Sequence, residues 1–398
     1  MSSTSPRRVA FYSHDTQGLG HIRRNTTLAA ALVAAHPDTD VLLITGNPEA
    51  AALPLPPRTD IATLPTIRKD EDGHYATRAM GSSLELVLDV RASIIDAALA
   101  AFAPDLLVVD KVPLGVRGEL EPALRTLRAL GTTRTVLGLR EVLDTPAVAM
   151  AEWAAAGTTE AVDEYFDEVW VYGDPAVYDL VAEYRLPASV AAKVVHTGYL
   201  GNGRGVGTTT RTGAASETEL PAGPYVLCLV GGGQDGHDLA DAFVDAPLPD
   251  GHAGLVVTGP FMTVAAREEL ERKAARTGTT VLGFVPDVDR LVAGAAAVVS
   301  MAGYNSVCEL LAAHVPTLLA PRLTPRAEQL VRAARLSDLD LVDVVEPHEL
   351  TPATVAAWTA AVVAAGPPTG APVDLDGLAR VPELAAALLA PRAVLRAA

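Results

Sequence analysis

Short runs of consecutive apolar residues alternate with longer stretches of helical periodicity along most of the chain. In the first half these runs are rich in Val, Leu and Ile, and they occupy residues 9–13, 41–45, 106–110, 135–139, 169–172 and 194–197. Segments with helical patterning separate most of them, among them residues 22–35, 84–102 and 116–130. A parallel strand that helices cover on both faces is apolar throughout rather than at every second position. The pattern therefore predicts an α/β fold built on doubly wound parallel sheets.

A change of composition interrupts this rhythm near the middle of the chain. Residues 201–223 are rich in Gly, Thr, Ser and Ala and hold little that is large and apolar, as flexible linkers do. Apolar runs then resume at residues 225–230, 255–258, 281–284, 297–300 and 317–320. A length of 398 residues also exceeds what one hydrophobic core usually serves. We therefore predict two Rossmann-like domains, residues 1–200 and 224–398, joined by a linker at 201–223 and facing each other across a cleft.

Composition and charge narrow the classes of partner. Apolar residues make up 49% of the chain and charged residues 20%, which indicates a folded protein rather than a disordered one. The net charge is −17, and both halves are acidic, so neither offers the basic face that a nucleic acid requires. The two cysteines, Cys228 and Cys308, lie far apart within apolar patterns, which favours buried thiols over a zinc site or a disulfide.

The chain also lacks the sequence features of membrane insertion or export. No stretch runs for 18 apolar residues without a charge, as a spanning helix requires. The first eight residues are polar and lead directly into a predicted strand, so we expect no signal peptide. A cytoplasmic location without a transmembrane segment is the expectation.

The turn between the first predicted strand and the first predicted helix, residues 13–24, concentrates reactive side chains. Gly18 and Gly20 permit a tight turn, and the N–H groups at the start of the following helix are open to an anion. The spacing begins like a dinucleotide fingerprint, but Arg23 stands at the third glycine position and no acidic residue ends the second strand. A nicotinamide dehydrogenase is therefore disfavoured. The side chains available for chemistry here are His14, Asp15, His21, Arg23 and Arg24.

Three glycines follow the first strand of the second predicted domain. Residues 231–233 are all glycine, and Gln234 comes next. Backbone N–H groups without side chains over them allow close approach of a diphosphate. A nucleotide-hydrolysing P-loop needs Lys and Ser or Thr after Gly236, whereas His237 and Asp238 stand there. This turn therefore predicts phosphate binding without ATPase chemistry.

The third turn, residues 300–309, ends a strand and opens a helix. Gly303 precedes the helix, whose first-turn N–H groups are open. Together with the side chains of Asn305 and Ser306 and the helix dipole, they can bind an anion. Glu309 follows about one turn into this helix, where a carboxylate can accept hydrogen bonds from a ribose diol. We therefore expect this helix to bind a nucleotide.

The fourth turn lies at residues 321–329. Thr324 followed by Pro325 predicts a helix N-cap and a first-turn proline. Glu328 and Gln329 then fall in the opening turns beside the same cleft, where an acid and an amide suit the recognition of sugar hydroxyls. A capping role for Glu328 is the competing interpretation.

Together the four turns resemble those of GT-B glycosyltransferases of the MurG type, which transfer N-acetylglucosamine from its UDP form. They resemble more closely the predicted bacterial glycosyltransferases that begin with a FYSHDTxGLGH segment, found here at residues 11–21. Residues 18–21 match the N-domain glycine loop, and residues 231–234 match a GGSQG-like loop in which Gly233 replaces a common Ser. Residues 302–309 match the helix whose glutamate holds the nucleotide ribose, and residues 328–329 match the pair that contacts the donor sugar.

This resemblance implies a hexosyltransferase that moves N-acetylglucosamine or a related hexose from a UDP-sugar to a hydroxyl group with inversion. The UDP-sugar is a co-substrate, and no cofactor is implied. The acceptor classes are a glycan, a lipid-linked molecule or a small molecule, and a lipid-linked acceptor implies peripheral membrane contact. The expected donor-binding residues are Gly20, Gly232, Gly233, Gln234, Phe284, Val285, Gly303, Tyr304, Asn305, Ser306, Glu309, Glu328 and Gln329, and the expected acceptor-binding residues are His14 and Arg23.

A base must remove the proton of the acceptor hydroxyl, and a group that titrates near neutrality does so best. His21, at the start of the first helix, fits this requirement, because an unperturbed histidine titrates near pH ~6.5. Asp110, at the end of another N-domain strand, is the candidate that orients His21. Asp15 and His14 are rival candidates in the same turn, and a capping or diphosphate-binding role is an alternative for His21.

Metal-dependent transfer and other activities on the same fold are the alternatives to metal-independent transfer. Asp-x-Asp occurs five times in this acidic chain, never directly after an apolar strand, so we expect no metal site. Glycine loops and a helix dipole can neutralise a leaving diphosphate instead. A non-hydrolysing UDP-sugar 2-epimerase is the alternative enzyme, with Asp110 and Glu141 as its extra carboxylates. A UDP-sugar-binding protein without turnover is the third hypothesis.

Overall fold

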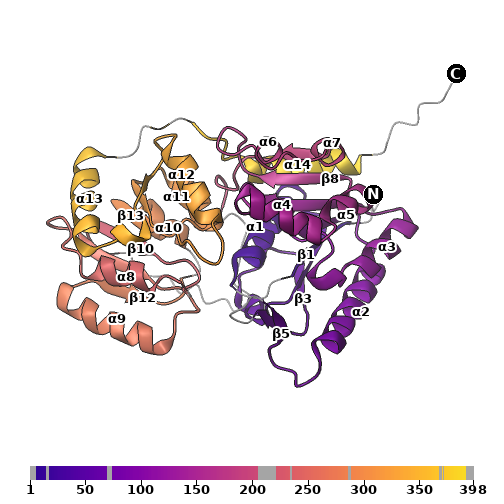
Figure 1. The fold of residues 1–398 in the computed structure, drawn as a ribbon, viewed down its shortest axis with the longest axis horizontal. Coiled ribbons are helices and arrows are strands. Elements are labelled where there is room, and N and C mark those ends of the chain that lie inside the picture. Colours follow the sequence, from indigo (N-terminus) through magenta and orange to yellow (C-terminus); the bar gives the residue numbers. More distant parts are fainter. Residues whose placement is uncertain are drawn as a thin grey trace.

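The chain folds into two α/β lobes that lie side by side (Figure 1). The structure is a computed structural model, and it describes residues 6–14, 18–69, 74–204, 221–233, 235–285, 288–366, 370 and 372–390. The N-terminal lobe is drawn in indigo to magenta and the second lobe in salmon to orange. Most of the predicted linker, residues 205–220, and the site residues Asp15 and Gln234 lie outside the described part.

The N-terminal domain is built on a seven-stranded parallel sheet in the order β3-β2-β1-β6-β7-β8-β9. Its strands are β1 (Arg7–Ser13), β2 (Thr39–Thr45), β3 (Thr59–Thr63), β6 (Leu106–Asp110), β7 (Arg134–Arg140), β8 (Glu168–Tyr172) and β9 (Val194–His196). Its helices are α1 (Gly20–Ala35), α2 (Leu84–Phe102), α3 (Glu121–Leu130), α4 (Pro146–Ala155), α5 (Thr158–Tyr165), α6 (Leu180–Tyr184) and α7 (Ala188–Ala191). Because the strand order reverses between β1 and β6, the residues that follow these two strands are the expected place for a ligand.

The second domain has a six-stranded parallel sheet in the order β12-β11-β10-β13-β14-β15. Its strands are β10 (Tyr225–Leu229), β11 (Ala253–Val257), β12 (Thr280–Leu282), β13 (Ala297–Ser300), β14 (Thr317–Leu319) and β15 (Asp343–Val344). Its helices are α8 (His237–Val244), α9 (Val264–Thr277), α10 (Val288–Ala293), α11 (Tyr304–Ala313), α12 (Glu328–Ser337) and α13 (Pro352–Ala365). The order here reverses between β10 and β13, which precede the glycine loop and α11 respectively.

The predicted α/β fold with doubly wound parallel sheets is confirmed, and most strands lie within two residues of their predicted bounds. The predicted helix at 116–130 is instead a 3₁₀ turn (Val116–Gly118) followed by α3, because Arg117 and Gly118 take left-handed backbone angles of φ 48° and 85°. The sequence analysis missed β3, β15 and a small antiparallel hairpin of β4 (Ile67–Lys69) and β5 (Tyr75–Thr77).

The chain crosses from one domain to the other twice. Its last described helix, α14 (Gly377–Leu389), leaves the second lobe and packs against α1 of the N-terminal domain (Figure 1). The outgoing and returning segments pair with each other, since Tyr199 N donates to Asp374 O at 2.8 Å and Leu200 forms an antiparallel bridge with Asp376. The domain limits proposed from composition stay a prediction, and this returning helix was not anticipated.

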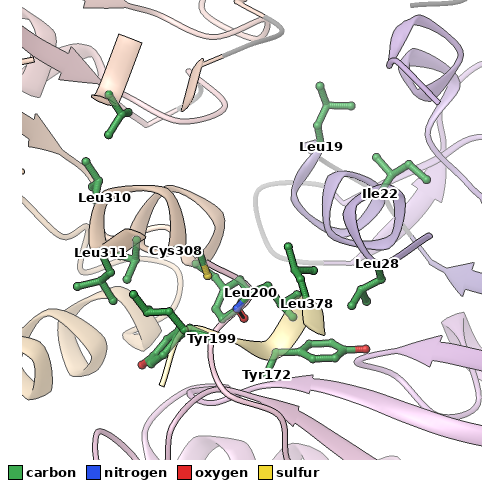
Figure 2. Close-up of a cluster of buried hydrophobic side chains, with 14 of the residues drawn as sticks. Leu19, Ile22, Leu28, Tyr172, Tyr199, Leu200, Cys308, Leu310, Leu311 and Leu378 are labelled. Carbon is green, nitrogen blue, oxygen red and sulfur yellow. Dashed lines mark hydrogen bonds between the residues drawn. The ribbon is translucent and has the colours of Figure 1, made fainter. Parts of the chain in front are cut away.

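One hydrophobic core continues between the two domains. Figure 2 shows Leu19 and the α1 side chains on one side, the α11 side chains on the other, and Leu200 and Leu378 between them, with Tyr199 below the α11 side. All of these side chains are at least nine-tenths buried, and the two cysteines are free and buried, as predicted. The turns that carry the candidate site therefore approach one another over a packed apolar base. Among the described residues, no helix has the length and apolar content needed to cross a membrane.

Candidate active site

His21, Asp110 and Arg24 form a cluster at the switch point of the N-terminal sheet. His21 is in the first turn of α1 and Asp110 ends β6, and the His21 Nδ1 lies 3.1 Å from the Asp110 Oδ2. Arg24, one turn further along α1, places Nη2 at 2.5 Å from both carboxylate oxygens of Asp110. The structure thus brings together two of the three predicted catalytic residues.

Burial and charge act in opposite directions on Asp110. Burial alone raises the pKa of a carboxyl, but the Arg24 guanidinium and His21 more than offset it and hold the pKa of Asp110 well below its usual range. Arg24 is itself buried, and Asp110 keeps its pKa above the ordinary value despite that burial. Asp110 is therefore ionised at neutral pH, and it can hold a proton on the Nδ1 of His21.

The nitrogen Nδ1 of His21 has two neighbours, one a hydrogen-bond acceptor and the other a hydrogen-bond donor. The Arg24 Nη2 lies 3.1 Å from it, as does the Asp110 carboxylate. With a proton on Nδ1 the ring donates to Asp110, and without one it accepts from Arg24. The first arrangement leaves Nε2 as a free base, and the His21 side chain is 20% exposed. The ring of His14 lies 5.1 Å from that of His21, centroid to centroid, and is buried.

The first turn of α1 meets α11 of the second domain directly. Asn305 Nδ2 donates to the backbone oxygen of Gly20 at 2.9 Å, and Arg23 Nη2 donates to Glu309 Oε1 at 3.0 Å. Arg204, which follows the outgoing crossing, donates to the same Oε1 at 3.2 Å. No hydrogen bond from a described residue reaches Glu309 Oε2. Glu309 is thus held in place by two arginines through one oxygen.

Tyr304 lies between cations of both domains rather than at the surface of α11. Its ring centroid is 5.6 Å from the guanidinium of Arg24 and 5.7 Å from that of Arg332, and it stacks on Tyr199 at 6.1 Å. The ring is buried, as befits a cation–π contact across an interface. Of the predicted donor-binding residues on this helix, Gly303, Asn305 and Ser306 are half-buried, whereas Tyr304 forms part of the interface core.

The glycine loop after β10 is packed against the turn that follows β11. Gly233 has φ 89°, and a Cβ there meets the backbone oxygen of Thr258 at 2.2 Å. Gly232 is exposed, its oxygen accepts from Phe261 N at 3.0 Å, and a Cβ there has its nearest neighbour at 3.6 Å. Glycine is therefore required for packing at 233, while at 232 it leaves backbone open to a ligand.

The segment beyond β12 places one aromatic side chain in solvent. Phe284 is exposed and the adjoining Val285 is buried in the interdomain core cluster. An exposed ring at the carboxyl edge of a sheet provides a flat apolar surface on which a nucleobase can stack.

Glu328 and Gln329 begin α12, close to the glycine loop. Arg322 Nη2 donates to Glu328 Oε1 at 3.1 Å, and the Arg322 backbone N donates to Gln329 Oε1 at 3.2 Å. Arg322 Nη1 also binds Asp235 of the glycine-loop turn at 2.6 Å. Three positive groups, Arg140 first, hold the pKa of Glu328 below its usual range against the effect of burial. Arg322 therefore connects both side chains to the glycine-loop turn, and their contact with the donor sugar stays a prediction.

The predicted helix cap before these residues is wrong. The helix α12 starts at Glu328 with Ala327 as its N-cap, and the peptide bond between Thr324 and Pro325 is cis. The segment before the helix is held by the other domain instead, because Ala327 N donates to Asp144 Oδ1 at 3.3 Å and Arg326 pairs with Asp144 and Glu152.

Several residues of this region escaped the sequence analysis. Arg24 was noted only as one of a group, and Lys111, Arg140 and Arg332 were not considered. The signal that points to Lys111 and Arg140 is their position immediately at or after a strand end at the switch-point edge, the same criterion that singled out Asp110. Among the described residues, no three His, Cys, Asp or Glu side chains are arranged to hold a metal ion.

Comparison with known proteins extends the structural findings. Residues 227–366 match the family model of the glycosyltransferase family 28 C-terminal domain. Among solved structures, the chain is similar to the spinosyn forosaminyltransferase SpnP, with 15% identity, a TM-score of 0.59 and coverage of 96% of this chain and 95% of that one. It is similar to LpCGTa in complex with UDP, with 15% identity, a TM-score of 0.56 and coverage of 96% and 94%. MurG of Acinetobacter baumannii gives 15% identity, a TM-score of 0.50 and coverage of 96% and 94%.

No curated protein matches the chain in sequence. Two parallel sheets of seven and six strands, matched over nearly the whole chain by these structures, define the GT-B fold. The chain is a glycosyltransferase of the GT-B fold. Its second domain is of the family 28 type, which confirms the resemblance stated from the sequence.

Proposed function

We propose that this glycosyltransferase moves a hexose, N-acetylglucosamine or a close relative, from a UDP-sugar to an acceptor hydroxyl with inversion and without a metal. The observation that carries the proposal is the contact of 3.1 Å between His21 Nδ1 and the ionised Asp110 carboxylate, on a helix that faces the family 28 domain. Two similar proteins, LpCGTa in complex with UDP and a UDP-glucosyltransferase from Polygonum tinctorium, support UDP as the nucleotide.

In this mechanism His21 acts as the base. Asp110 accepts a hydrogen bond from Nδ1–H, which leaves Nε2 to take the proton of the acceptor hydroxyl as its oxygen attacks the anomeric carbon. The bond from that carbon to the UDP oxygen breaks on the opposite face of the sugar, which inverts the configuration. Asp110 then stabilises the imidazolium, as the buried carboxylate of a catalytic triad does.

The second domain supplies the donor site. Gly232 and the first turn of α11, with Asn305 and Ser306, approach the diphosphate, and Glu309 accepts the ribose hydroxyls through its second oxygen. The uracil ring stacks on Phe284, and Glu328 and Gln329 contact the sugar. The helix dipole and the backbone N–H groups stabilise the negative charge that develops on the leaving UDP.

The test is the release of UDP from UDP-N-acetylglucosamine with a panel of acceptors, at saturating donor. We expect His21→Ala to lower turnover by about 10²–10⁴-fold while UDP affinity stays within twofold. His14→Ala removes the rival ring and keeps the contact between His21 and Asp110, so its turnover is compared with that of His21→Ala. Loss of turnover in Asp15→Asn with near-normal turnover in His21→Ala assigns the base to Asp15 and rejects our assignment.

Two carboxylates cited for an epimerase are engaged in other contacts. Glu141 accepts from Arg332 at 2.5 Å and from the Tyr199 hydroxyl at 3.2 Å, and it is fully buried. Asp110 is held ionised by Arg24. Neither is free to act on a sugar. Incubation with UDP-N-acetylglucosamine alone separates the activities, since an epimerase needs no acceptor. A binding protein without turnover predicts UDP-sugar binding and no UDP release with any acceptor.

A further inference from the structure

Two cations end neighbouring strands beside the proposed base. Lys111 directly follows Asp110 at the end of β6, and its backbone N continues the ladder by donating to Gly138 O of β7 at 2.9 Å. Arg140 is the last residue of β7. Because β6 and β7 are adjacent and parallel, both side chains leave the same edge of the sheet as Asp110.

Neither cation has an anionic partner in the described part of the chain. Both are half-buried, and neither makes a side-chain hydrogen bond or an ion pair with a described residue. Every other arginine at this junction is paired: Arg23 and Arg204 with Glu309, Arg24 with Asp110, Arg326 with Asp144 and Glu152, and Arg332 with Glu141. Two unpaired cations beside one another are costly unless something else supplies negative charge.

The pKa values of Lys111 and Arg140 reflect this unfavourable electrostatic environment. Burial, then the guanidinium groups of Arg140 and Arg326, lower the pKa of Lys111 to about 7, and the carboxylates of Glu152 and Glu328 only partly compensate. Burial and Arg332 lower the pKa of Arg140 to about 10, with Glu328 acting in the other direction. Lys111 is therefore poised to gain a proton when an anion arrives.

We propose that Lys111 and Arg140 bind an acid group of the acceptor, a phosphate or a carboxylate that lies close to the hydroxyl receiving the sugar. The assignment of this anion to the acceptor, close to its reacting hydroxyl, rests on the proposed function. The anion site itself rests only on the two cations, their shared strand edge and the absence of a described partner.

The position of the pair favours the acceptor over the donor. Both residues belong to the N-terminal domain, and Lys111 adjoins the residue that holds His21, whose Nε2 must reach the acceptor hydroxyl. The diphosphate elements, in contrast, come from the other domain: Gly232 follows β10 and Asn305 opens α11. An acid group held at Lys111 and Arg140 therefore fixes an acceptor against the base while the donor occupies the opposite domain.

Calorimetric titration with methyl phosphate, acetate and UDP tests this directly, on the wild type, Lys111→Met, Arg140→Gln and the control Arg125→Gln. Arg125 is an exposed arginine on α3 that pairs with Glu121, so its loss changes net charge equally. Methyl phosphate and acetate are titrated with and without saturating UDP. We expect one of them to bind the wild type and the control alike, and about tenfold more weakly to each of the other two variants. UDP should bind all four proteins within twofold.

The expected heats carry a second signature. Because Lys111 takes up a proton, the apparent enthalpy in the wild type should change between buffers of different ionisation enthalpy, and Lys111→Met should abolish that change. The variant Arg140→Lys keeps the cation and should retain the affinity, which guards against a misfolded Arg140→Gln.

Three results decide the matter. Equal affinity of all four proteins for both anions rejects the anion site. Parallel loss of UDP and anion binding in Lys111→Met and Arg140→Gln assigns the pair to the donor diphosphate and rejects the acceptor role. Anion binding through both cations in a protein that binds no UDP leaves the anion site standing and rejects the proposed donor instead.

Discussion

Arg332 of α12 and Glu141, directly after β7, form an ion pair that is fully buried between the two domains, with Nε 2.5 Å from Oε1. Arg332 also donates to the backbone oxygen of Ala302 at 2.9 Å. The pair therefore fastens the turn before α11 to the N-terminal sheet. Removal of one partner leaves an uncompensated charge in the interior, which is far more costly than removal of both.

We expect Arg332→Met to lower the free energy of unfolding by roughly 3–5 kcal/mol, because it leaves the Glu141 carboxylate buried and unpaired. Urea denaturation measures the change. The double variant Arg332→Met with Glu141→Leu should recover a large part of the loss. If the loss of unfolding free energy in the double variant equals the sum of the losses in the two single variants, the two side chains do not act as a pair.

Asp110 should make the fold sensitive to acid. Its pKa is held below the ordinary value in the folded state, so it stabilises the protein above the unfolded value of ~3.9 and loses that effect as pH falls below it. Asp110→Asn should flatten the loss of stability between about pH 5 and pH 3. Urea midpoints across this range, compared with those of the exposed control Asp60→Asn, provide the measurement. A slope that Asp110→Asn leaves unchanged counts against the electrostatic account.

Lys111 should act in the opposite pH range. Its pKa falls from 10.5 to about 7 on folding, so between these values the unfolded chain binds more protons and stability rises with pH. We expect the Tm to increase from pH 7 to pH 9, and Lys111→Met to remove much of that increase. Saturating methyl phosphate should also reduce it. Identical pH profiles of wild type and variant would show that Lys111 does not carry the charge penalty.

Glu309 should contribute to nucleotide binding through the oxygen that the arginines leave open. Glu309→Ala removes the acceptor of the ribose hydroxyls, a loss of about 1.5–3 kcal/mol in UDP affinity, or roughly 10–150-fold. Calorimetry with UDP measures it. Arg23→Gln, which removes a neighbour of Glu309 and keeps the carboxylate, is the matched control. UDP affinity within twofold of the wild type in Glu309→Ala contradicts the placement of the ribose.

The glycines of the 231–233 loop should separate packing from binding. Gly233→Ser places a Cβ against the backbone oxygen of Thr258 and requires a left-handed backbone, so we expect a Tm lower by several degrees. Gly232→Ala has room for its methyl group and should keep the Tm while weakening UDP binding. Normal stability of Gly233→Ser would mean that this loop rearranges freely.

The sequence predicted the fold well because a buried parallel strand leaves an unmistakable apolar run. The run at 106–110 matches β6 residue for residue, and it led to Asp110 at the switch-point edge. The edge strands β3 and β15 were missed because they are partly exposed, and their residues alternate or include charges.

Contacts between the domains were beyond the reach of the sequence. Arg332 is one of several arginines in a helical pattern, and its partner Glu141 lies 191 residues away. The same holds for Asn305 and Gly20, which were both predicted to bind the donor and prove to contact each other. Periodicity reports which face of an element is covered, and it carries no information on which distant residue covers it.

The two segments that cross between the domains are hydrogen-bonded to each other. Backbone hydrogen bonds tie Tyr199 to Asp374 and Gly377, so the outgoing and returning chains behave as a single strap. A movement that keeps the two segments together preserves these hydrogen bonds, whereas one that slides either segment along the other breaks them. Cleavage between α13 and α14 leaves the outgoing segment as the one covalent link between the lobes, which then depend on contacts such as the buried Arg332–Glu141 pair.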